Sequence, residues 1–491
     1  MRCRSSRRSG ISATPPSLKA STDVTRAATP TRLPALGPAG PYRGTRIETV
    51  PDVTGAVVAE LSLVPWLFAQ RAVRALRWAA PRPPGERAAL LAEAGRIFAE
   101  GEVDGVGVDE HCRTVASVAG TPISVVRDVV GMVAQHAATA YDSARQARPI
   151  GTADSWRDDR ARHGCGVWTR RGEVLAVHAP ANSAAVHTAW IDALALGYRV
   201  ALRPSQREPF TSYRLVSALR QAGYGGDQAA LLPTDHPTAD RLVAEADLAL
   251  AFGSDGVVGN YGAGTRVLPF GPGRSKVLIT AGTDPAAHLD TIVESVAGQA
   301  GTGCVNATAV FVEGDATPVA EAIAARLAQI PSMPPGDERA RLPVSPAGAA
   351  RAVQEHLAGR VGGARALDGA PAVDDLGDGS AVLRPAVFLL DRADAPQARI
   401  EMGFPCVWVA PWHRERDGTA SLRHTLSLTV LTGGADPAAD LDADLIDAMV
   451  AEPTIDKVHV GDHPTTWTRP GMPHEGYLGD FLMRSKAVIV G

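Results

Sequence analysis

The sequence has few of the features that mark metal sites, disulfide frameworks or membrane spans. Its 491 residues include only five cysteines, which are widely scattered, with no CxxC pair and no Cys/His cluster at metal-ligand spacing. We therefore expect no bound metal, no disulfide framework and a reducing, cytoplasmic location. The most apolar stretch after the N-terminal region, residues 61–68, is too short to span a bilayer and contains Pro65.

The chain also lacks a strong bias of charge. A net charge of −4 gives no reason to expect a nucleic acid or an anionic membrane as a partner, since local arginine clusters are balanced by nearby Asp and Glu. The fractions that are present, 45% hydrophobic and 21% charged residues, are typical of a soluble globular protein. The length suffices for two or three domains with ample cores.

The pattern of elements along the chain predicts an α/β protein. The first 45 residues are rich in Arg, Ser, Thr, Pro and Gly without an apolar period, which predicts a disordered tail. Residues 65–144 repeat apolar residues at helical spacing, and strands alternate with helices over residues 173–252. This alternation predicts a parallel, doubly wound sheet that binds ligands at the carboxyl ends of its strands.

Cys304 is the most informative single residue. It follows the small residues Gly301-Thr-Gly303 and precedes an apolar run, 305–312, which predicts a thiol at the mouth of a packed sheet. Four further motifs accompany it along the chain: Pro180-Ala-Asn182, Arg203-Pro-Ser-Gln206, Phe252-Gly-Ser254 and Glu401-Met-Gly-Phe-Pro405. Together they indicate a cysteine nucleophile, an amide that steadies an oxyanion and an adjacent nucleotide site.

In this order, over residues 50–491, the motifs resemble those of the aldehyde dehydrogenase superfamily. The resemblance implies that Cys304 is the catalytic nucleophile and that the Asn182 side chain forms the oxyanion hole together with the Cys304 backbone N–H. It also implies a nucleotide site, whose expected contacts are Pro180, Arg203, Ser205, Gln206, Gly253, Ser254, Glu401 and Phe404.

The resemblance assigns each nucleotide contact a role. Arg203-Pro-Ser-Gln206 stands where the family has a Lys-x-x-Glu that holds the adenosine ribose, and Gly253-Ser254 resembles the turn that receives the pyrophosphate. Glu401 resembles the residue that holds the nicotinamide ribose. Gln206 is neutral where a Glu would repel a 2′-phosphate, and nearby Arg207 adds positive charge, which favours NADPH over NADH.

One departure from the family pattern bears on the reaction. Hydrolytic members carry a Glu that activates water on the acyl-enzyme, and counting back from Cys304 without a gap places Phe270 there. Loss of a general base slows water attack by about 10²–10⁴-fold. The resemblance is therefore closest to the acyl-CoA and fatty-acyl thioester reductases. It implies that an acyl thioester, on CoA or an acyl-carrier protein, acylates Cys304 and is reduced to an aldehyde by NAD(P)H, and that the reverse reaction follows the same chemical path.

Two other functions stay open at this point. An ordinary NAD(P)-dependent aldehyde dehydrogenase would produce a carboxylic acid, with another group activating water. A catalytically degenerate homologue would act as a binding partner. Single residues also have structural interpretations. Asn182 would cap the following helix, and Glu401 would be a solvated acid in a loop. We expect His178, His463 and His474 to be surface or hydrogen-bonded structural residues.

The resemblance completes the domain plan. It implies an aldehyde dehydrogenase-like α/β fold with a small β arm for oligomerisation, as a homodimer or tetramer. The predicted segments are a tail (1–45), a nucleotide-binding domain (46–271) with a hairpin arm (160–172), a catalytic domain (272–445) and a C-terminal return (446–491) ending in a strand (486–490). Aromatic residues make up only 5% of the chain, and no motif identifies the acyl group.

Overall fold

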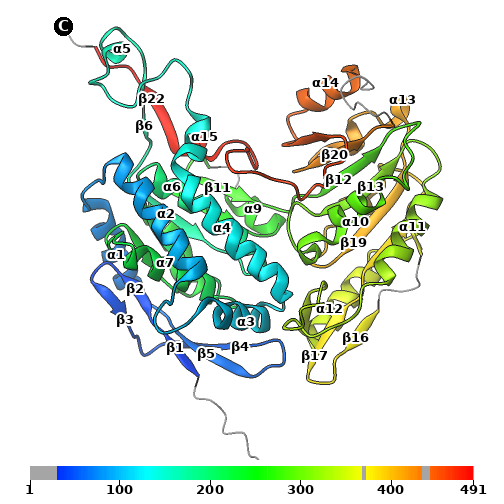
Figure 1. Cartoon of the computed structure of the whole chain (residues 1–491), viewed down its shortest axis with the longest axis horizontal. Helices are drawn as coiled ribbons and strands as arrows, with labels where there is room; N and C mark the ends of the chain where they lie inside the picture. The colour runs from blue at the N-terminus through cyan, green and yellow to red at the C-terminus, as the bar shows by residue number, and fades with distance from the viewer. Residues whose placement is uncertain (1–29, 262–263, 368–371, 434–442, 490–491) are drawn as a thin grey trace, which may run out of the picture.

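Two α/β lobes make up the protein, seen in a computed structural model that describes residues 30–261, 264–367, 372–433 and 443–489 (Figure 1). Each lobe is built around a seven-stranded sheet. The α/β fold class predicted from the sequence, with a doubly wound sheet in the first lobe and a second α/β unit, is therefore confirmed.

The sheet of the first lobe has the order β11-β10-β7-β8-β9-β2-β3. The five strands from β11 to β9 are parallel, and β2 and β3 join antiparallel at one edge. The strands are β2 (Ala35–Gly37), β3 (Gly40–Tyr42), β7 (Val174–His178), β8 (Arg199–Arg203), β9 (Ala229–Leu231), β10 (Leu248–Phe252) and β11 (Val267–Phe270). The central strands are apolar and buried, as expected for strands covered on both faces.

Helices cover both faces of this sheet. One face carries α2, α4, α6 and α7, and the other carries α1 and α8. In the crossover between β10 and β11 the structure describes only one short helix, α9. The helices of this lobe are α1 (Trp66–Trp78), α2 (Pro84–Glu100), α3 (Val108–Ala119), α4 (Ile123–Ala144), α5 (Asp159–Arg162), α6 (His187–Ala195), α7 (Phe210–Gln221), α8 (His236–Glu245) and α9 (Asp255–Tyr261).

The second lobe has the sheet order β15-β18-β19-β13-β12-β20-β21, parallel except for β15. Its strands are β12 (Ser275–Ile279), β13 (Ala307–Val312), β15 (Arg365–Ala366), β18 (Ala386–Leu389), β19 (Cys406–Pro411), β20 (Leu428–Leu431) and β21 (Val458–Val460). Its helices are α10 (Leu289–Ala297), α11 (Thr317–Ala328), α12 (Ala347–Ala358), α13 (Arg414–Asp417) and α14 (Ala443–Ala451).

The prediction of a disordered tail up to residue 45 is wrong from residue 30 onward. Leu36 of β2 pairs with Leu231 of β9 and extends the first sheet. These strands are three residues long, too short to show a period against a Pro- and Gly-rich background. Residues 1–29 lie outside the described residues. A small three-stranded sheet in this region has the order β1 (Thr31–Leu33), β5 (Val57–Ser62) and β4 (Ile47–Pro51). A second one, in the second lobe, has the order β14 (Val344–Pro346), β17 (Ser380–Leu383) and β16 (Val373–Asp375).

The C-terminal segment connects the two lobes. It leaves β21, runs between the lobes and enters α15 (Leu478–Leu482) and β22 (Met483–Lys486) (Figure 1). The last strand pairs antiparallel with β6 (Val167–Arg170) in a projecting two-stranded arm. This strand lies earlier than the predicted 486–490, because the register with β6 is set by residues 483–486. No helix in the part of the chain that the structure describes is long and apolar enough to cross a bilayer.

Candidate active site

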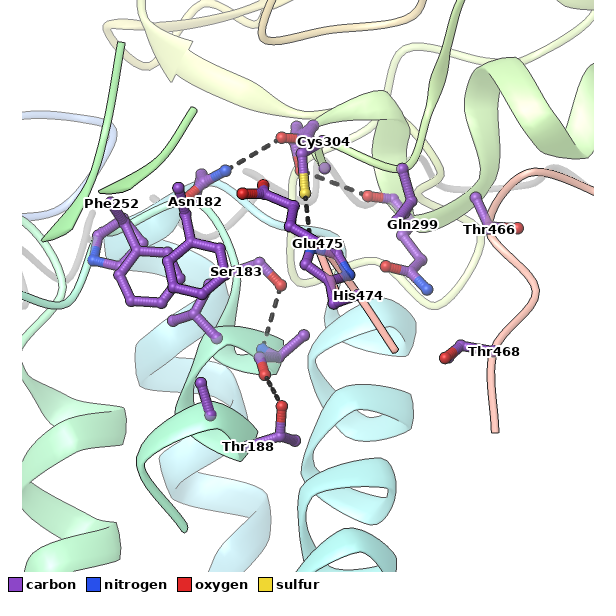
Figure 2. Close-up of a pocket in the computed structure, with 18 of the residues that line it drawn as sticks. Asn182, Ser183, Thr188, Phe252, Gln299, Cys304, Thr466, Thr468, His474 and Glu475 are labelled. Carbon is purple, nitrogen blue, oxygen red and sulfur yellow. Dashed lines mark hydrogen bonds between the residues drawn. The ribbon is translucent and has the colours of Figure 1, made fainter. Parts of the chain in front are cut away.

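A cavity of ≈790 Å³ lies between the two lobes. The first lobe contributes the ends of β7, β10 and β11, where Asn182, Phe252 and Phe270 line the wall. Cys304 lines it from the second lobe, just before β13. The C-terminal segment crosses the cavity and adds side chains that follow residue 465 (Figure 2). Ligand sites at the carboxyl ends of parallel strands are the general rule for such sheets.

The loop that carries Cys304 turns sharply. Gln299, Ala300 and Gly301 have φ angles of 52°, 66° and 66°, which carry the chain from α10 toward β13. At Gly301 a side chain has no room, since a Cβ would lie 2.6 Å from Cγ of Pro405. Non-glycine residues in this backbone region cost about 1–3 kcal/mol each and cluster at functional sites. The strain therefore marks this loop as one whose conformation is imposed by its surroundings.

Asn306 and Ser275 hold the loop in that conformation. The Asn306 side chain accepts from the Gly303 N–H at 2.9 Å and donates to the Gly298 carbonyl at 2.8 Å. The Ser275 hydroxyl donates to the Cys304 carbonyl at 3.0 Å. These bonds fix the backbone on both sides of the thiol, which is the support that a positioned nucleophile needs.

Gly273 packs directly against the Cys304 backbone, and replacing it is predicted to displace the thiol. A Cβ at this position would lie 2.0 Å from the Cys304 carbonyl oxygen, so the two backbones must separate by an ångström or more in Gly273→Ala. A displacement of about 1 Å costs on the order of 10²-fold in rate. Steady-state kinetics should show a loss of this size, and an unchanged rate would contradict the geometry. Gly363→Ala, at a glycine with open space around it, is the matched control.

Asn182 reaches from the first lobe to the Cys304 loop. It follows β7 on an exposed turn, and its Nδ2 donates to the Thr302 carbonyl at 3.2 Å (Figure 2). It does not cap the following helical turn, because the Ser183 hydroxyl accepts from the Ala185 N–H at 3.1 Å instead. The amide is therefore placed beside the thiol and is not used by the local backbone.

Phe270 is the residue that the ungapped count from Cys304 predicts at the position of the Glu of hydrolytic members. It ends β11 and stacks on Phe252, with ring centroids 4.6 Å apart and an angle of 9° between the rings. Both rings line the cavity. An apolar wall that offers no proton acceptor therefore faces the thiol from this direction.

His474 and Lys457 lie on the other side of the sulfur. The Nε2 atom of His474 is 3.6 Å from Sγ of Cys304, and its Nδ1 atom is 3.5 Å from Nζ of Lys457 (Figure 2 shows the first contact). Burial and the nearby Lys457 charge lower the pKa of His474 to about 3, so its imidazole is neutral. Burial also lowers the pKa of Lys457.

Glu475 is a carboxyl group near the thiol that the sequence analysis did not identify. Its side chain occupies the space between Asn182 and Cys304 in Figure 2, carried there by the C-terminal segment. Burial, reinforced by Asp456, raises the pKa of Glu475 to about 8. The sequence did not reveal this carboxyl group because it lies far from Cys304 along the chain.

The resting thiol is protonated. Burial raises the pKa of Cys304 to about 12, and the carboxyl groups of Glu401 and Glu475 raise it further than Lys457 lowers it. Since the thiolate is the nucleophile, the site has to remove this proton before Cys304 attacks.

Glu401 lies on the nucleotide side of the cavity. Its Oε2 accepts from the Arg274 backbone N–H at 2.7 Å, and burial raises its pKa to about 7. The Arg274 side chain forms an ion pair at 2.6 Å with Asp255, at the start of α9. Gly253 and Ser254, just before α9, line the cavity as well. Glu401 is thus not a solvated loop acid but is tied to the loop before β12.

Comparison with known proteins fits this arrangement. The model of the aldehyde dehydrogenase family matches residues 40–422, most of the chain. The chain belongs to the aldehyde dehydrogenase family. Members of this family are oxidoreductases that act on aldehydes. No curated protein sequence matches the chain.

Solved aldehyde dehydrogenases share the fold over nearly the whole chain. An NAD-dependent aldehyde dehydrogenase from Sinorhizobium meliloti is 20% identical, with a TM-score of 0.76 and 95% and 96% of the two chains covered. Gamma-glutamyl-gamma-aminobutyraldehyde dehydrogenase from Burkholderia cenocepacia J2315 is 19% identical, with a TM-score of 0.75 and 92% and 95% covered. A mutant aldehyde dehydrogenase C from Pseudomonas syringae, in complex with NAD+ and octanal, is 20% identical, with a TM-score of 0.76 and 93% and 96% covered.

In this family member the sequence-predicted residues divide into two groups. The cavity brings together Cys304, Asn182, Pro180, Gly253, Ser254 and Glu401. Three others lie at the end of β8, outside the cavity lining: Arg203, Ser205 and Gln206. Phe404 is buried in the core of the second lobe and does not line the cavity, so its predicted contact with the nucleotide is not seen among the described residues.

Lys457, His474 and Glu475 are the site residues that sequence reasoning missed. His474 was expected to be a surface or structural residue, whereas it contacts the Cys304 sulfur. Residues 461–477 form no helix or strand in this dehydrogenase, so no period in the sequence indicates which of their side chains face inward. The one available signal is the acid–base pair His474-Glu475 within a stretch rich in Pro and Gly.

Proposed function

We propose that the protein reduces an acyl thioester to an aldehyde with NAD(P)H through an acyl-Cys304 intermediate, and that the path is reversible. The observation that carries this proposal is Phe270, which stacks on Phe252 at the edge of the cavity and which the ungapped count from Cys304 assigns to the position of the general base of hydrolytic relatives. Without a base at that position, water attack on the acyl-enzyme slows by about 10²–10⁴-fold. The acyl group then survives long enough to be reduced, or to be returned to a thiol.

The residues around the thiol support the acylation step. The Cys304 thiolate attacks the carbonyl carbon of the thioester, and a sulfur–carbon bond forms. The oxyanion accepts hydrogen bonds from the Cys304 backbone N–H and from Asn182, which exchanges its 3.2 Å bond to the Thr302 carbonyl for this contact. Expulsion of the substrate thiol leaves the acyl group on Cys304.

A nicotinamide nucleotide, when bound, supplies the hydride that converts the acyl group to an aldehyde. Relatives of the same fold support this cofactor, since one is NAD-dependent and another is in complex with NAD+. The residues present fit such a group. Nε of Arg203 is buried at the end of β8 and has no hydrogen-bond partner within the described residues. Gln206 donates to the Thr234 carbonyl at 3.2 Å and, being neutral, does not itself repel a 2′-phosphate, which favours NADPH.

The remaining features of the proposal concern partners. The substrate thiol is that of CoA or of an acyl-carrier protein. We expect a homodimer or tetramer in the cytoplasm, with the arm of β6 and β22 as the contact between copies. Within the described residues Ala153 bridges to Val167 on the far side of β6, whereas β22 pairs only with β6, so the outer edge of β22 is open.

A second candidate function, aldehyde oxidation to a carboxylic acid, is favoured by Glu475. Its carboxyl group lies beside the thiol, but its pKa of about 8 leaves it mostly protonated at neutral pH. A protonated carboxyl group accepts no proton from water. As the pH rises through 8, Glu475 ionises and becomes able to act as a base.

Acid release should therefore depend on pH through Glu475. In the wild-type protein the ratio of acid to thioester formed from an aldehyde should rise about tenfold between neutral pH and one unit above the Glu475 pKa. Glu475→Gln should remove this rise while leaving thioester formation at neutral pH within about threefold, because a neutral side chain already occupies the position there. Chromatographic product analysis across pH measures both. An equal rise in Glu475→Gln would assign the base to another group.

Product analysis at neutral pH separates the two functions. With an acyl-CoA and NADPH, the thioester reductase forms aldehyde and free thiol in equal amounts. With an aldehyde and an oxidised nucleotide, it forms product only when a thiol acceptor is present. Acid formed at neutral pH without any thiol acceptor would establish the second function and overturn the first. Nucleotide binding without turnover in either direction would instead support the degenerate homologue.

A further inference from the structure

Cys304, His474 and Lys457 form a continuous line of exchangeable protons. Sγ of Cys304 lies 3.6 Å from Nε2 of the imidazole, and the opposite ring nitrogen lies 3.5 Å from Nζ of Lys457. The three residues come from the loop before β13, the C-terminal segment and the residue before β21. Lys457 is buried, so its amine is screened from bulk water. Hydrogen bonds of catalytic groups are often long in the absence of substrate and tighten when it binds.

We propose that these three residues are a proton relay, in which the thiol proton of Cys304 is transferred to the amine of Lys457 through His474. The inference rests on the proposed role of Cys304 as the nucleophile. The proposed resting form has a neutral amine on Lys457, a state that burial favours because it lowers the pKa of this group. In that form the thiol donates to Nε2, and the Nδ1–H of His474 donates to the amine. In the activated form the thiolate accepts from Nε2–H, and the ammonium group of Lys457 donates to Nδ1.

The transfer balances without charging the imidazole. The S–H bond breaks and its electron pair stays on sulfur, while an Nε2–H bond forms. The Nδ1–H bond breaks, and a third N–H bond forms on Nζ. The ring changes tautomer and is neutral before and after, as required of an imidazole whose burial lowers its pKa to about 3. His474 touches the reacting sulfur and is catalytic in this scheme; Lys457 acts through it.

The groups around the relay are compatible with this role. Phe270 packs against the imidazole, with centroids 6.3 Å apart, and screens one side of the ring from water. Glu475 and Glu401 are the carboxyl groups that act on the thiol, and Asp456 and Glu475 act on Lys457. Burial raises the pKa of Glu475 to about 8, so at neutral pH it is mostly neutral.

Alkylation of Cys304 by iodoacetamide tests the relay without substrate or nucleotide. The full-length protein is alkylated over a range of pH, and the Cys304 peptide is quantified by mass spectrometry. The relay holds the same number of protons in its resting and activated forms, so the fraction of activated form does not depend on pH. A plot of the wild-type alkylation rate against pH should therefore be flat around neutral pH. His474→Gln and Lys457→Met should lose the plateau and fall about tenfold per pH unit below the thiol pKa. At neutral pH both should be about 10²-fold slower.

The controls keep the outcomes distinct. His474→Gln retains a hydrogen-bonding group but is unable to pass a proton from the Cys304 sulfur to the Lys457 amine. His356→Ala is the control, because it changes an exposed histidine on α12 that does not line the cavity. Circular dichroism and thermal unfolding report whether each variant folds. A wild-type plateau that persists in folded His474→Gln or Lys457→Met would overturn the relay. The proposed function fails separately, if the plateau is present but no acyl thioester acylates Cys304.

Discussion

Cys304→Ala should abolish turnover while nucleotide binding is largely kept. The thiol is the only group that forms the covalent intermediate in the proposed mechanism, and removing such a nucleophile lowers kcat by about 10⁴-fold or more. The Ala side chain lacks only the sulfur atom, and the bonds that hold the loop involve the Cys304 carbonyl and neighbouring backbone groups. Rates with an acyl-CoA and NADPH, together with calorimetric titration of the nucleotide, measure the two effects.

Cys165→Ala is the matched control for this variant. Cys165 is also part-buried, but it precedes β6 of the arm and does not line the cavity. Its replacement should leave turnover within about twofold, as is usual for substitutions away from a site. Turnover of Cys304→Ala at the wild-type rate would remove the assignment of the nucleophile altogether.

Phe270→Glu should convert the protein into a thioester hydrolase. A carboxylate there restores a base where hydrolytic relatives carry one, and a positioned base accelerates water attack by about 10²–10⁴-fold. In the absence of nucleotide, the wild-type protein should release one equivalent of thiol in a burst and then nearly stop at neutral pH. The variant should continue to release thiol and acid at a steady rate, which a thiol-reactive dye and chromatography record.

Phe270→Gln separates the base from the loss of the aromatic stack. Both substitutions remove the ring that packs on Phe252, and they differ only in the proton acceptor. Thiol release should therefore stay low after the burst in Phe270→Gln. Equal hydrolysis by the two variants would mean that the ring merely excludes water, and that the missing carboxylate does not explain the survival of the acyl group.

Regular patterns in the sequence predicted the parts of the molecule that depend on local order. The alternation of apolar strands and helices over residues 173–252 predicted the doubly wound sheet, and small residues around Cys304 predicted a thiol at a sheet mouth. Asn182 and the Gly253-Ser254 turn were found from motifs at strand ends, Glu401 was found from its own motif before β19, and the cavity brings them together. The carboxyl ends of parallel strands lie along the same edge of a sheet. A residue that directly follows such a strand in the sequence is therefore placed at the ligand-binding edge.

Residues that act through long-range packing were not predictable in this way. His474 and Glu475 reach the thiol on a segment without regular structure, whose path is set by the two lobes it connects. Phe404 was placed in the nicotinamide site by motif alone, but packing of β19 against the core buries it. The three-residue strands near residue 35 form because β9 offers an open edge, which no local pattern encodes.

An intact-mass spectrum taken after mixing the protein with an acyl-CoA, at neutral pH and without nucleotide, tests the central claim most directly. We expect a mass increase of one acyl group, located by peptide mapping on Cys304, which disappears with release of aldehyde when NADPH is added. An unmodified protein, or an adduct that decays to free acid equally fast with and without NADPH, would contradict the account.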